Sequence, residues 1–422
     1  MPRTAIIELP VIAGYNWDQL RSGAVFILAA SSFLVFVEPA PVDLLFFVTL
    51  LFFLRSGLSL TIGAAPMVLL LVLYNLGGFA SVIPVAGKEK TMMFAVTSTY
   101  MAMSAIFLAY YLSYDPVRRF RVIRAGLIVA GLCAAIAGLL DYADIGGLFP
   151  NTALKGRATG TFKDPNVFST FIILPGMLLM HGLMTGEARH KFWSFIGLLI
   201  ISAGVFFSFS RGAWINYLAA SVLLALMTFM LSPQGGVRKR IFVFMVVGAF
   251  AGFLAFTILM SIENVRTMFL ERFSLLQSYD SGETGRFGNQ LNSIPVLMTL
   301  PLGFGPLQYR SVFGMDPHNT FINSFASYGW LGGISYLLLI VTTIAAGLRS
   351  IFTKTPWQYA AICVFCPLLT TILQGVQIDT DHWRHFYWLL GMNWGLFAAT
   401  LQPVAIRDGL AALRPQRTLA SA

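Results

Sequence analysis

Long apolar stretches separated by short polar or charged clusters fill most of this chain. A helix needs about 20 mostly apolar residues to cross a bilayer, and charges are almost absent inside these stretches. The pattern predicts an all-α polytopic membrane protein with about twelve transmembrane helices. We place them near residues 23–37, 42–57, 63–80, 91–112, 122–140, 166–184, 192–209, 213–231, 241–262, 331–348, 357–374 and 385–401.

Composition points to the same class of protein. Hydrophobic residues make up 57% of the 422 residues, and charged residues make up 11%. Soluble globular domains carry roughly 25% charged residues, so this chain does not fit that class. The same figures exclude a disordered chain, a collagen and a coiled coil.

The net charge of +10 comes from 28 basic and 18 acidic residues. With the N-terminus in the cytoplasm, 17 basic and 5 acidic residues lie on the inner side of the membrane. The inner face then carries +12 and the outer face −2, as the positive-inside rule requires. We therefore expect both termini in the cytoplasm and no nucleic-acid partner.

The windows divide the chain into three parts. Residues 1–262 hold nine transmembrane helices, and residues 331–422 hold three more and a cytoplasmic tail. Between them, residues 263–330 form the only long loop, on the outer side. Loops beyond about 15 residues are usually functional or disordered, and this one is too apolar for disorder. We expect a lid packed on the outer surface.

Two shorter outer segments carry basic residues close to the membrane. The Gly-rich loop from Gly156 to Asn166 contains Arg157 and Lys163, and it leads directly into a helix. It could cradle a phosphate with its backbone N–H groups, or form an ordinary re-entrant turn. In the second segment, Ser210 is placed to cap the next helix and Arg211 to bind an anion at its N-terminus, unless Arg211 reaches lipid headgroups instead.

The long loop adds a histidine and several arginines. His318 stands just before a helix and titrates near neutral pH, so it could accept a proton from a hydroxyl or simply cap the helix. Planar guanidinium groups can grip the oxygens of a diphosphate. Other arginines would pair with the loop glutamates. The arginines of the loop are Arg266, Arg272, Arg286 and Arg310, and the glutamates are Glu263, Glu271 and Glu283.

The last outer loop, residues 379–385, contains Asp379, Asp381 and Arg384 next to two histidines. The two carboxylates could bind Mg²⁺ or Mn²⁺ beside a sugar phosphate. They could equally pair with arginine in a solvated loop. The choice stays open at this point.

Several motifs resemble the O-antigen ligase and O-antigen polymerase superfamily of bacterial membrane glycosyltransferases. His318 and Asn319, nine further residues and then Gly329-x-x-Gly332 match the long-loop pattern of that family. The Gly-rich loop, the Ser-Arg-Gly turn, the Thr-Gly-Arg segment and the Pro-x-Gly-x-Gly segment precede it in the same order, over residues 156–332.

The resemblance implies a GT-C-type fold in the inner membrane and transfer of a glycan from undecaprenyl diphosphate on the periplasmic side. It implies an inverting reaction without metal or cofactor, with His318 as base and Arg211 and Arg286 on the diphosphate. Arg157 and Lys163 are further candidates for the same anion. Asn319 and Arg384 are candidates for orienting the substrate. A metal at Asp379 and Asp381 would depart from this family mechanism.

The acceptor is less defined than the donor. We expect an O-antigen ligase, which places the glycan on the lipid A core. A polymerase, which uses a lipid-linked glycan as acceptor, shares the same motifs. A lipid-linked glycan flippase would also need a cationic outer pocket, but the scarcity of polar residues inside the spans argues against a route for the headgroup. A membrane scaffold would not need His318 among so many arginines.

Overall fold

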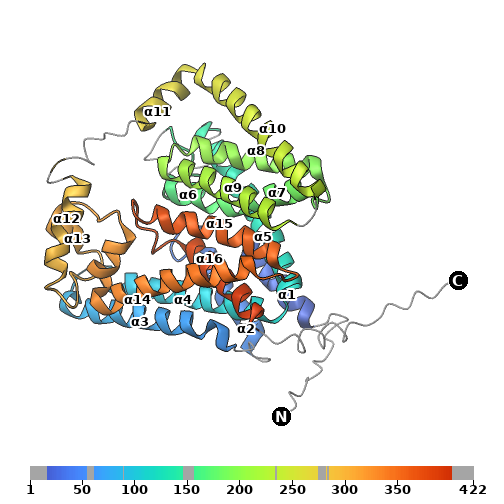
Figure 1. Ribbon diagram of the computed structural model, residues 1–422. Helices are drawn as coiled ribbons and strands as arrows, with labels where there is room; N and C mark the ends of the chain where they lie inside the picture. The colour runs from blue at the N-terminus through green and yellow to red at the C-terminus, as the bar shows by residue number, and fades with distance from the viewer. Residues whose placement is uncertain are drawn as a thin grey trace, which may run out of the picture.

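The computed structural model describes residues 17–54, 61–88, 90–145, 156–232, 235–273, 282 and 285–401 (Figure 1). These residues form helices and their connections, with no strand among them, so the prediction of an all-α chain is confirmed. The helices are α1 Trp17–Ala30, α2 Pro41–Leu54, α3 Ala65–Val82, α4 Thr91–Tyr114, α5 Pro116–Tyr142, α6 Pro165–Phe171, α7 Ile173–Thr185, α8 Lys191–Phe207, α9 Arg211–Leu231, α10 Gly235–Met260, α11 Glu263–Phe273, α12 Arg286–Leu297, α13 Tyr309–Phe313, α14 Thr320–Phe352, α15 Gln358–Gln374 and α16 Arg384–Thr400.

Each predicted window overlaps at least one helix, but the helices differ in length from the windows and from one another. In the described part of the chain, seven are long and apolar enough to cross a membrane: Ile62–Val85, Thr91–Tyr114, Pro116–Tyr142, Pro165–Thr185, Arg211–Leu231, Gly235–Met260 and Thr320–Phe352. Pro41–Phe53, Lys191–Phe207 and Gln358–Gln374 are apolar but shorter. The total of twelve spans and the GT-C-type fold stay predictions.

Part of the topology argument falls outside the described residues. Arg3, Glu8, Arg55, Arg407, Asp408, Arg414 and Arg417 contribute to the charge count, and Glu283 to the long loop, but none of them is described. The same holds for the cytoplasmic tail.

Helix boundaries follow local chemistry that hydropathy misses. α5 begins six residues before the predicted window because Asp115 accepts a hydrogen bond from the N–H of Arg118, and Pro116 occupies the first turn. The predicted span at 166–184 is two helices, α6 and α7, which part at Ile172. Pro175 has no N–H to donate to the carbonyl four residues earlier, which weakens the helix at this point.

The glycines of the Gly329-x-x-Gly332 motif shape α14. Gly329 has a φ of 66° and interrupts the helical backbone, and a Cβ there would lie 2.5 Å from the carbonyl oxygen of Pro301. The N–H of Trp330 donates to this same carbonyl at 2.9 Å. Gly332 meets α3, since a Cβ on Gly77 would lie 2.6 Å from the Gly332 nitrogen. The motif thus joins α14 to the segment before α13 and to α3.

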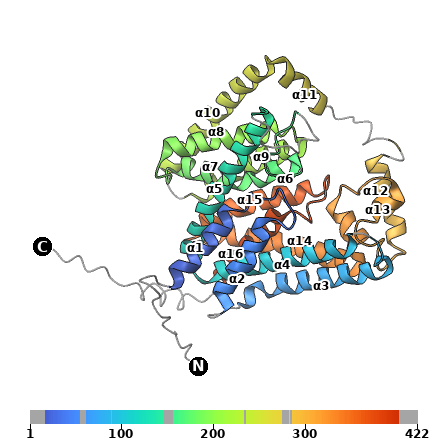
Figure 2. The same cartoon turned by 180° about the vertical axis from the view of Figure 1, so that it is seen from behind.

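The helices pack so that the predicted long loop lies beside one end of the body. α14 packs on α3, α16 on α4 and α15 on α9. α12 and α13 lie together at one edge of the molecule in both views and contact α14, whereas α11 lies at the top beside the end of α10 (Figures 1 and 2). The starts of α9, α12, α14 and α16 and the end of α15 supply the residues of the candidate site. The role of a lid stays a prediction.

Candidate functional site

A cavity of about 370 Å³ gathers four arginines and one histidine from segments far apart in the sequence. No aspartate or glutamate is among the described residues that line it. We call it the arginine cavity, and its lining residues are Arg157, Asn166, Phe209, Ser210, Arg211, Gly212, Arg272, Arg286, Met315, His318, Gln374, Gln377 and Ile378. Three predicted diphosphate ligands, Arg157, Arg211 and Arg286, therefore share one space with His318.

Two of these arginines are the first residues of helices. Arg211 begins α9, where the Ser210 hydroxyl caps the helix by accepting from the N–H of Ala213 at 3.3 Å. The same hydroxyl donates to the side-chain oxygen of Asn166 at 2.6 Å, which ties α9 to α6. Arg286 begins α12. A cation at a helix N-terminus adds to the positive end of the helix dipole, so both positions favour an anion in the cavity.

Phe209, just before the capping serine, has a φ of 46°, in the left-handed region that residues with a side chain rarely adopt. This turn directs the end of α8 into the start of α9. Strained backbone of this kind persists where the surrounding structure holds it and often lies at functional sites. The predicted tight turn is therefore present, and it places Arg211 on the cavity.

The Gly-rich loop does not use its backbone as a phosphate cradle. The N–H groups of Thr159 and Gly160 both donate to one carboxylate oxygen of Asp141, each at 2.9 Å. The Thr159 hydroxyl donates to the same oxygen at 2.7 Å. Because these donors are already bound, the expectation of a backbone cradle is wrong. Arg157 still lines the arginine cavity, where its Nε donates to the carbonyl of Ser208 at 2.8 Å.

The arginines of the long loop fall into two groups. Arg266 pairs with Glu263 at 2.7 Å, as the predicted pairing with loop glutamates requires, and Arg310 lies 4.0 Å from Asp316. Arg272 and Arg286 line the arginine cavity instead. The Nε atom of Arg272 is buried and has no hydrogen-bond partner among the described residues. Arg272, which stood out in the sequence only as one of four loop arginines, thus joins Arg286 in the site.

His318 is held by a carboxylate from the last outer loop. Asp379 accepts hydrogen bonds from the backbone N–H of His318 at 3.1 Å and of Asn319 at 2.9 Å. A φ of 46° at His318 turns these two consecutive groups toward the same carboxylate. The Nδ1 atom of the His318 ring lies 3.8 Å from Asp379. The arrangement brings an acid next to the candidate base.

Other contacts fix the same segment. The side-chain amide of Gln290, on α12, donates to the carbonyl of Pro317 at 2.7 Å. Asn319 caps α14, since its side-chain oxygen accepts from the N–H groups of Phe321 and Ile322. The N–H of Thr320 donates to the carbonyl of Gly375 at 2.7 Å. The cap assigns Asn319 a structural part in placing His318, next to its predicted part in orienting substrate.

The two aspartates of the last loop have different partners. Asp381 is 1% exposed and accepts from the side-chain amide of Asn323 at 2.9 Å, and Tyr74 and His382 lie 3.5 and 3.4 Å from it. Burial, and next the charge of Asp381, raise the pKa of Asp379 to about 8, against the backbone N–H groups that favour its charged form. In the part of the chain that the structure describes, no three acidic, histidine or cysteine side chains are grouped as metal ligands.

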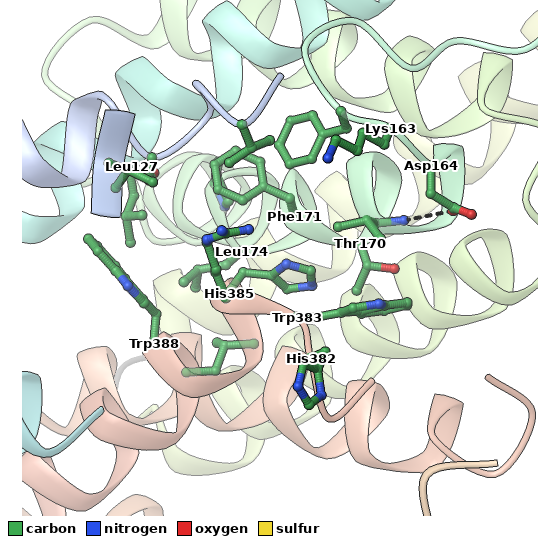
Figure 3. A pocket seen from close by; sticks show the side chains of 18 of the residues that line it. Leu127, Lys163, Asp164, Thr170, Phe171, Leu174, His382, Trp383, His385 and Trp388 are labelled. Atoms are coloured by element: carbon green, nitrogen blue, oxygen red, sulfur yellow. Dashed lines mark hydrogen bonds between the residues drawn. The ribbon is translucent and has the colours of Figure 1, made fainter. Parts of the chain in front are cut away.

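Lys163 and Arg384, two other predicted site residues, line a second cavity of about 170 Å³. Two tryptophans, Trp383 and Trp388, also line it, and we call it the tryptophan cavity (Figure 3). Its other lining residues are Ser32, Val35, Glu38, Val42, Tyr100, Leu127, Phe162, Asp164, Val167, Thr170, Phe171, Leu174, Pro175, His382, His385 and Leu389. The predicted site residues are therefore divided between two cavities, except Asn319, which is among the described lining residues of neither.

Several site residues lacked a recognisable signal in the sequence. Gln374 and Gln377 line the arginine cavity from the end of α15, and Asn166 lines it from α6. Asp379 stood out as one half of an acidic pair, but its contact with the backbone at His318 joins residues 61 positions apart. Such contacts depend on how the helices pack, so the sequence around each residue does not predict them.

Comparison with known families gives one match. The family model described as O-antigen ligase matches residues 196–337, which are 142 of the 422 residues. The matched segment includes Arg211, Arg272, Arg286 and His318, and it ends within α14. No curated protein matches the chain. With seven apolar helices of spanning length, the match indicates a membrane protein, and it confirms the resemblance to the O-antigen ligase and O-antigen polymerase superfamily.

Proposed function

We propose that this protein is an O-antigen ligase, an inverting glycosyltransferase that moves a glycan from undecaprenyl diphosphate to the lipid A core at the periplasmic face of the inner membrane. The observation that carries the proposal is the arginine cavity, in which four arginines and His318 meet without a lining carboxylate among the described residues. Planar guanidinium groups bind the oxygens of a diphosphate bidentately, so this group of arginines suits such a leaving group.

In this proposal the arginines hold the donor. Arg211, Arg286 and Arg157 bind the diphosphate oxygens, and Arg272 adds a fourth guanidinium. The N-terminal ends of α9 and α12 favour the same anion. As the bond from the anomeric carbon to the phosphate oxygen breaks, negative charge grows on the diphosphate. Cations fixed around it stabilise that charge more in the transition state than in the bound substrate, and this difference lowers the barrier.

His318 acts on the acceptor. Its ring accepts the proton of an acceptor hydroxyl while the hydroxyl oxygen attacks the anomeric carbon from the side opposite the diphosphate. The new glycosidic bond forms as the old bond breaks, so the configuration inverts, and the diphosphate leaves as an anion on its lipid. Asp379, at 3.8 Å from Nδ1, fixes the ring and stabilises the imidazolium when it is ionised.

Lys163 has a different place in the proposal. It lines the tryptophan cavity and pairs with Glu38 at 3.3 Å, so we assign the diphosphate to the arginines alone. Arg384 is bound to Asp43 in the same cavity. If Lys163 or Arg384 contacts the substrate, it does so from the tryptophan cavity.

A polymerase is the second candidate, because the family match includes His318 and three of the four cavity arginines, which both activities would use. The two reactions share the donor and differ in the acceptor. Deletion of the gene separates them by analysis of surface and lipid-linked glycans. Loss of a ligase leaves bare lipid A core while long chains accumulate on the lipid carrier, whereas loss of a polymerase leaves core that carries a single repeat.

A purified system tests the chemistry itself. Protein in lipid nanodiscs, given an undecaprenyl-diphosphate-linked glycan and lipid A core, should form the product and release undecaprenyl diphosphate. Transfer that stops with EDTA and returns with Mg²⁺ would instead assign the chemistry to a metal at Asp379 and Asp381. Export of the lipid-linked glycan without any transfer would contradict the enzyme and favour a flippase.

A further inference from the structure

The tryptophan cavity has no part in the chemistry proposed above, yet it has the features of a binding site. Pockets for small molecules are mostly apolar and aromatic, with a few polar groups that fix orientation. Its volume is about 170 Å³. An apolar cavity of about 150 Å³ accommodates a benzene molecule, so the tryptophan cavity has room for one six-membered ring.

The cations of this cavity are matched by carboxylates. Lys163 lies 3.3 Å from Glu38. Arg384 donates from Nε and from a terminal nitrogen to the two oxygens of Asp43, each at 2.8 Å, in a bidentate pair. The remaining lining carboxylate, Asp164, caps α6 by accepting from the N–H of Asn166 at 2.6 Å. Since both cations are paired and this carboxylate is hydrogen-bonded, the cavity does not call for an ion. Its chemistry favours a neutral ligand.

One polar atom in the cavity is left without a partner. The Nε2 atom of His385 is buried and has no hydrogen-bond partner among the described residues. Its ring lies between the lining aromatic side chains, with centroids 5.3 Å from Trp383 and 6.1 Å from Phe171 (Figure 3). A buried polar atom without a partner costs free energy, and a ligand hydroxyl would remove that cost.

The two cavities border the same short helix. On α6, Asn166 lines the arginine cavity, and Val167 and Thr170 line the tryptophan cavity. The Thr170 hydroxyl lies 3.3 Å from the side-chain amide of Gln374, and Gln374 lines the arginine cavity. The tryptophan cavity is therefore a neighbour of the proposed diphosphate site.

We propose that the tryptophan cavity is a saccharide subsite, which takes one neutral pyranose ring of a glycan substrate. The proposal rests on the proposed function for the identity of the glycan. Sugar rings present C–H faces that suit aromatic side chains, and hydroxyl groups that suit the unpartnered Nε2 of His385. An acyl chain would fill the apolar lining but leave that nitrogen without a partner.

Saturation-transfer NMR on the full chain in nanodiscs tests the subsite directly. The probes are the methyl glycosides of glucose, galactose, N-acetylglucosamine and rhamnose. At least one should receive saturation from the protein, and His385→Leu should weaken its binding roughly tenfold, the order expected for one lost hydrogen bond to a buried group. His385→Gln, which keeps a donor and an acceptor, should bind more tightly than His385→Leu. The matched control His190→Leu changes an exposed histidine and should bind as the unaltered protein does.

Two results would overturn the proposal. One is saturation that neither His385 variant changes although both elute as monodisperse protein. The other is the absence of saturation for every glycoside together with quenching of Trp383 and Trp388 by brominated acyl chains, which would assign the cavity to lipid. Because the readout is binding, a protein that binds glycosides but transfers no glycan would contradict the proposed function and leave the subsite in place.

Discussion

The arginine cavity and the tryptophan cavity both border the Gly-rich loop and α6. They differ in whether carboxylates line the cavity together with the cations. In the tryptophan cavity, Lys163 and Arg384 each meet a carboxylate. In the arginine cavity, four guanidinium groups line the space with no carboxylate among the described lining residues. The number of cations alone is therefore a poor guide to an anion site. The arginine cavity is distinguished by a described lining that combines several guanidinium groups with no carboxylate.

The largest expected effect in this comparison is at His318. A general base contributes about 10²–10⁴-fold to a rate, so His318→Ala should lower kcat by that order. The measurement is the rate of glycan transfer in nanodiscs, with His190→Ala, at an exposed histidine outside both cavities, as the matched control that should keep the normal rate. Transfer at the normal rate by folded His318→Ala protein would remove His318 from the mechanism.

Removal of a cation from the arginine cavity should have the next largest effect. A hydrogen bond to a charged group contributes about 1.5–3 kcal/mol, so Arg211→Ala or Arg286→Ala should lower kcat/KM about 10- to 100-fold. Arg→Lys at either position keeps the charge but loses the bidentate grip, and its loss should be smaller. Arg266→Ala and Arg310→Ala remove arginines that pair outside the cavity and should leave the rate unchanged. Equal losses in both groups would show that general charge, and not the cavity, matters.

The pH profile depends on Asp379. Its raised pKa, about 8, leaves the carboxyl mostly neutral below that pH and charged above it. Only the charged form stabilises the imidazolium of His318, so the rate should rise between about pH 7 and pH 9. Asp379→Asn cannot ionise, so it should lose this rise and be about tenfold slower at the alkaline end, the order expected for a lost interaction with a charged group.

Stability provides the check on the sign of this shift. A raised pKa means that folding favours the protonated carboxyl. Its contribution to stability is complete below about pH 4, the pKa of an unperturbed aspartate, and is lost as the pH rises from there to about 8. The melting temperature of the unaltered protein should therefore fall more between about pH 4 and pH 8 than that of Asp379→Asn. A rate that rises equally in both proteins would assign the titration to another group.

The smallest effect on transfer is expected at the paired charges. Breaking a buried ion pair lowers the free energy of unfolding by about 3–5 kcal/mol. Because the Arg384 side chain is 25% exposed, we expect Asp43→Asn to lower it by about half as much. Thermal unfolding should show a lower melting temperature, and Asp43→Asn combined with Arg384→Gln should recover part of it. Lost transfer with an unchanged melting temperature would instead give the pair a part in the reaction.

Much of the fold could be predicted because hydrophobic length is a local property. Every predicted window holds a helix, whereas the break at Ile172 and the early start of α5 depend on Pro175 and on the Asp115 cap. α14 continues through Gly329 because the segment around Pro301 packs into its kink. That contact joins residues distant in sequence, and hydropathy carries no information about it.

The site was partly predictable because its motifs, like hydrophobic length, are local properties of the sequence. Arg157, Arg211, Arg286 and His318 meet in one cavity, as the motifs predict. Arg157 and Lys163 share one loop but line different cavities, since Asp141 binds the backbone between them. The sequence pattern places a residue on an outer segment, but only the fold determines the face to which it turns.

Binding of undecaprenyl diphosphate tests the central claim most directly, because it requires the arginine cavity and no acceptor. Isothermal titration in nanodiscs should give specific binding that falls about 100-fold or more in Arg211→Ala/Arg286→Ala, if each arginine contributes at least the tenfold expected for a charged hydrogen bond. Arg266→Ala/Arg310→Ala, which removes the same charge outside the cavity, should bind normally. Equal affinity in both double variants would contradict the account.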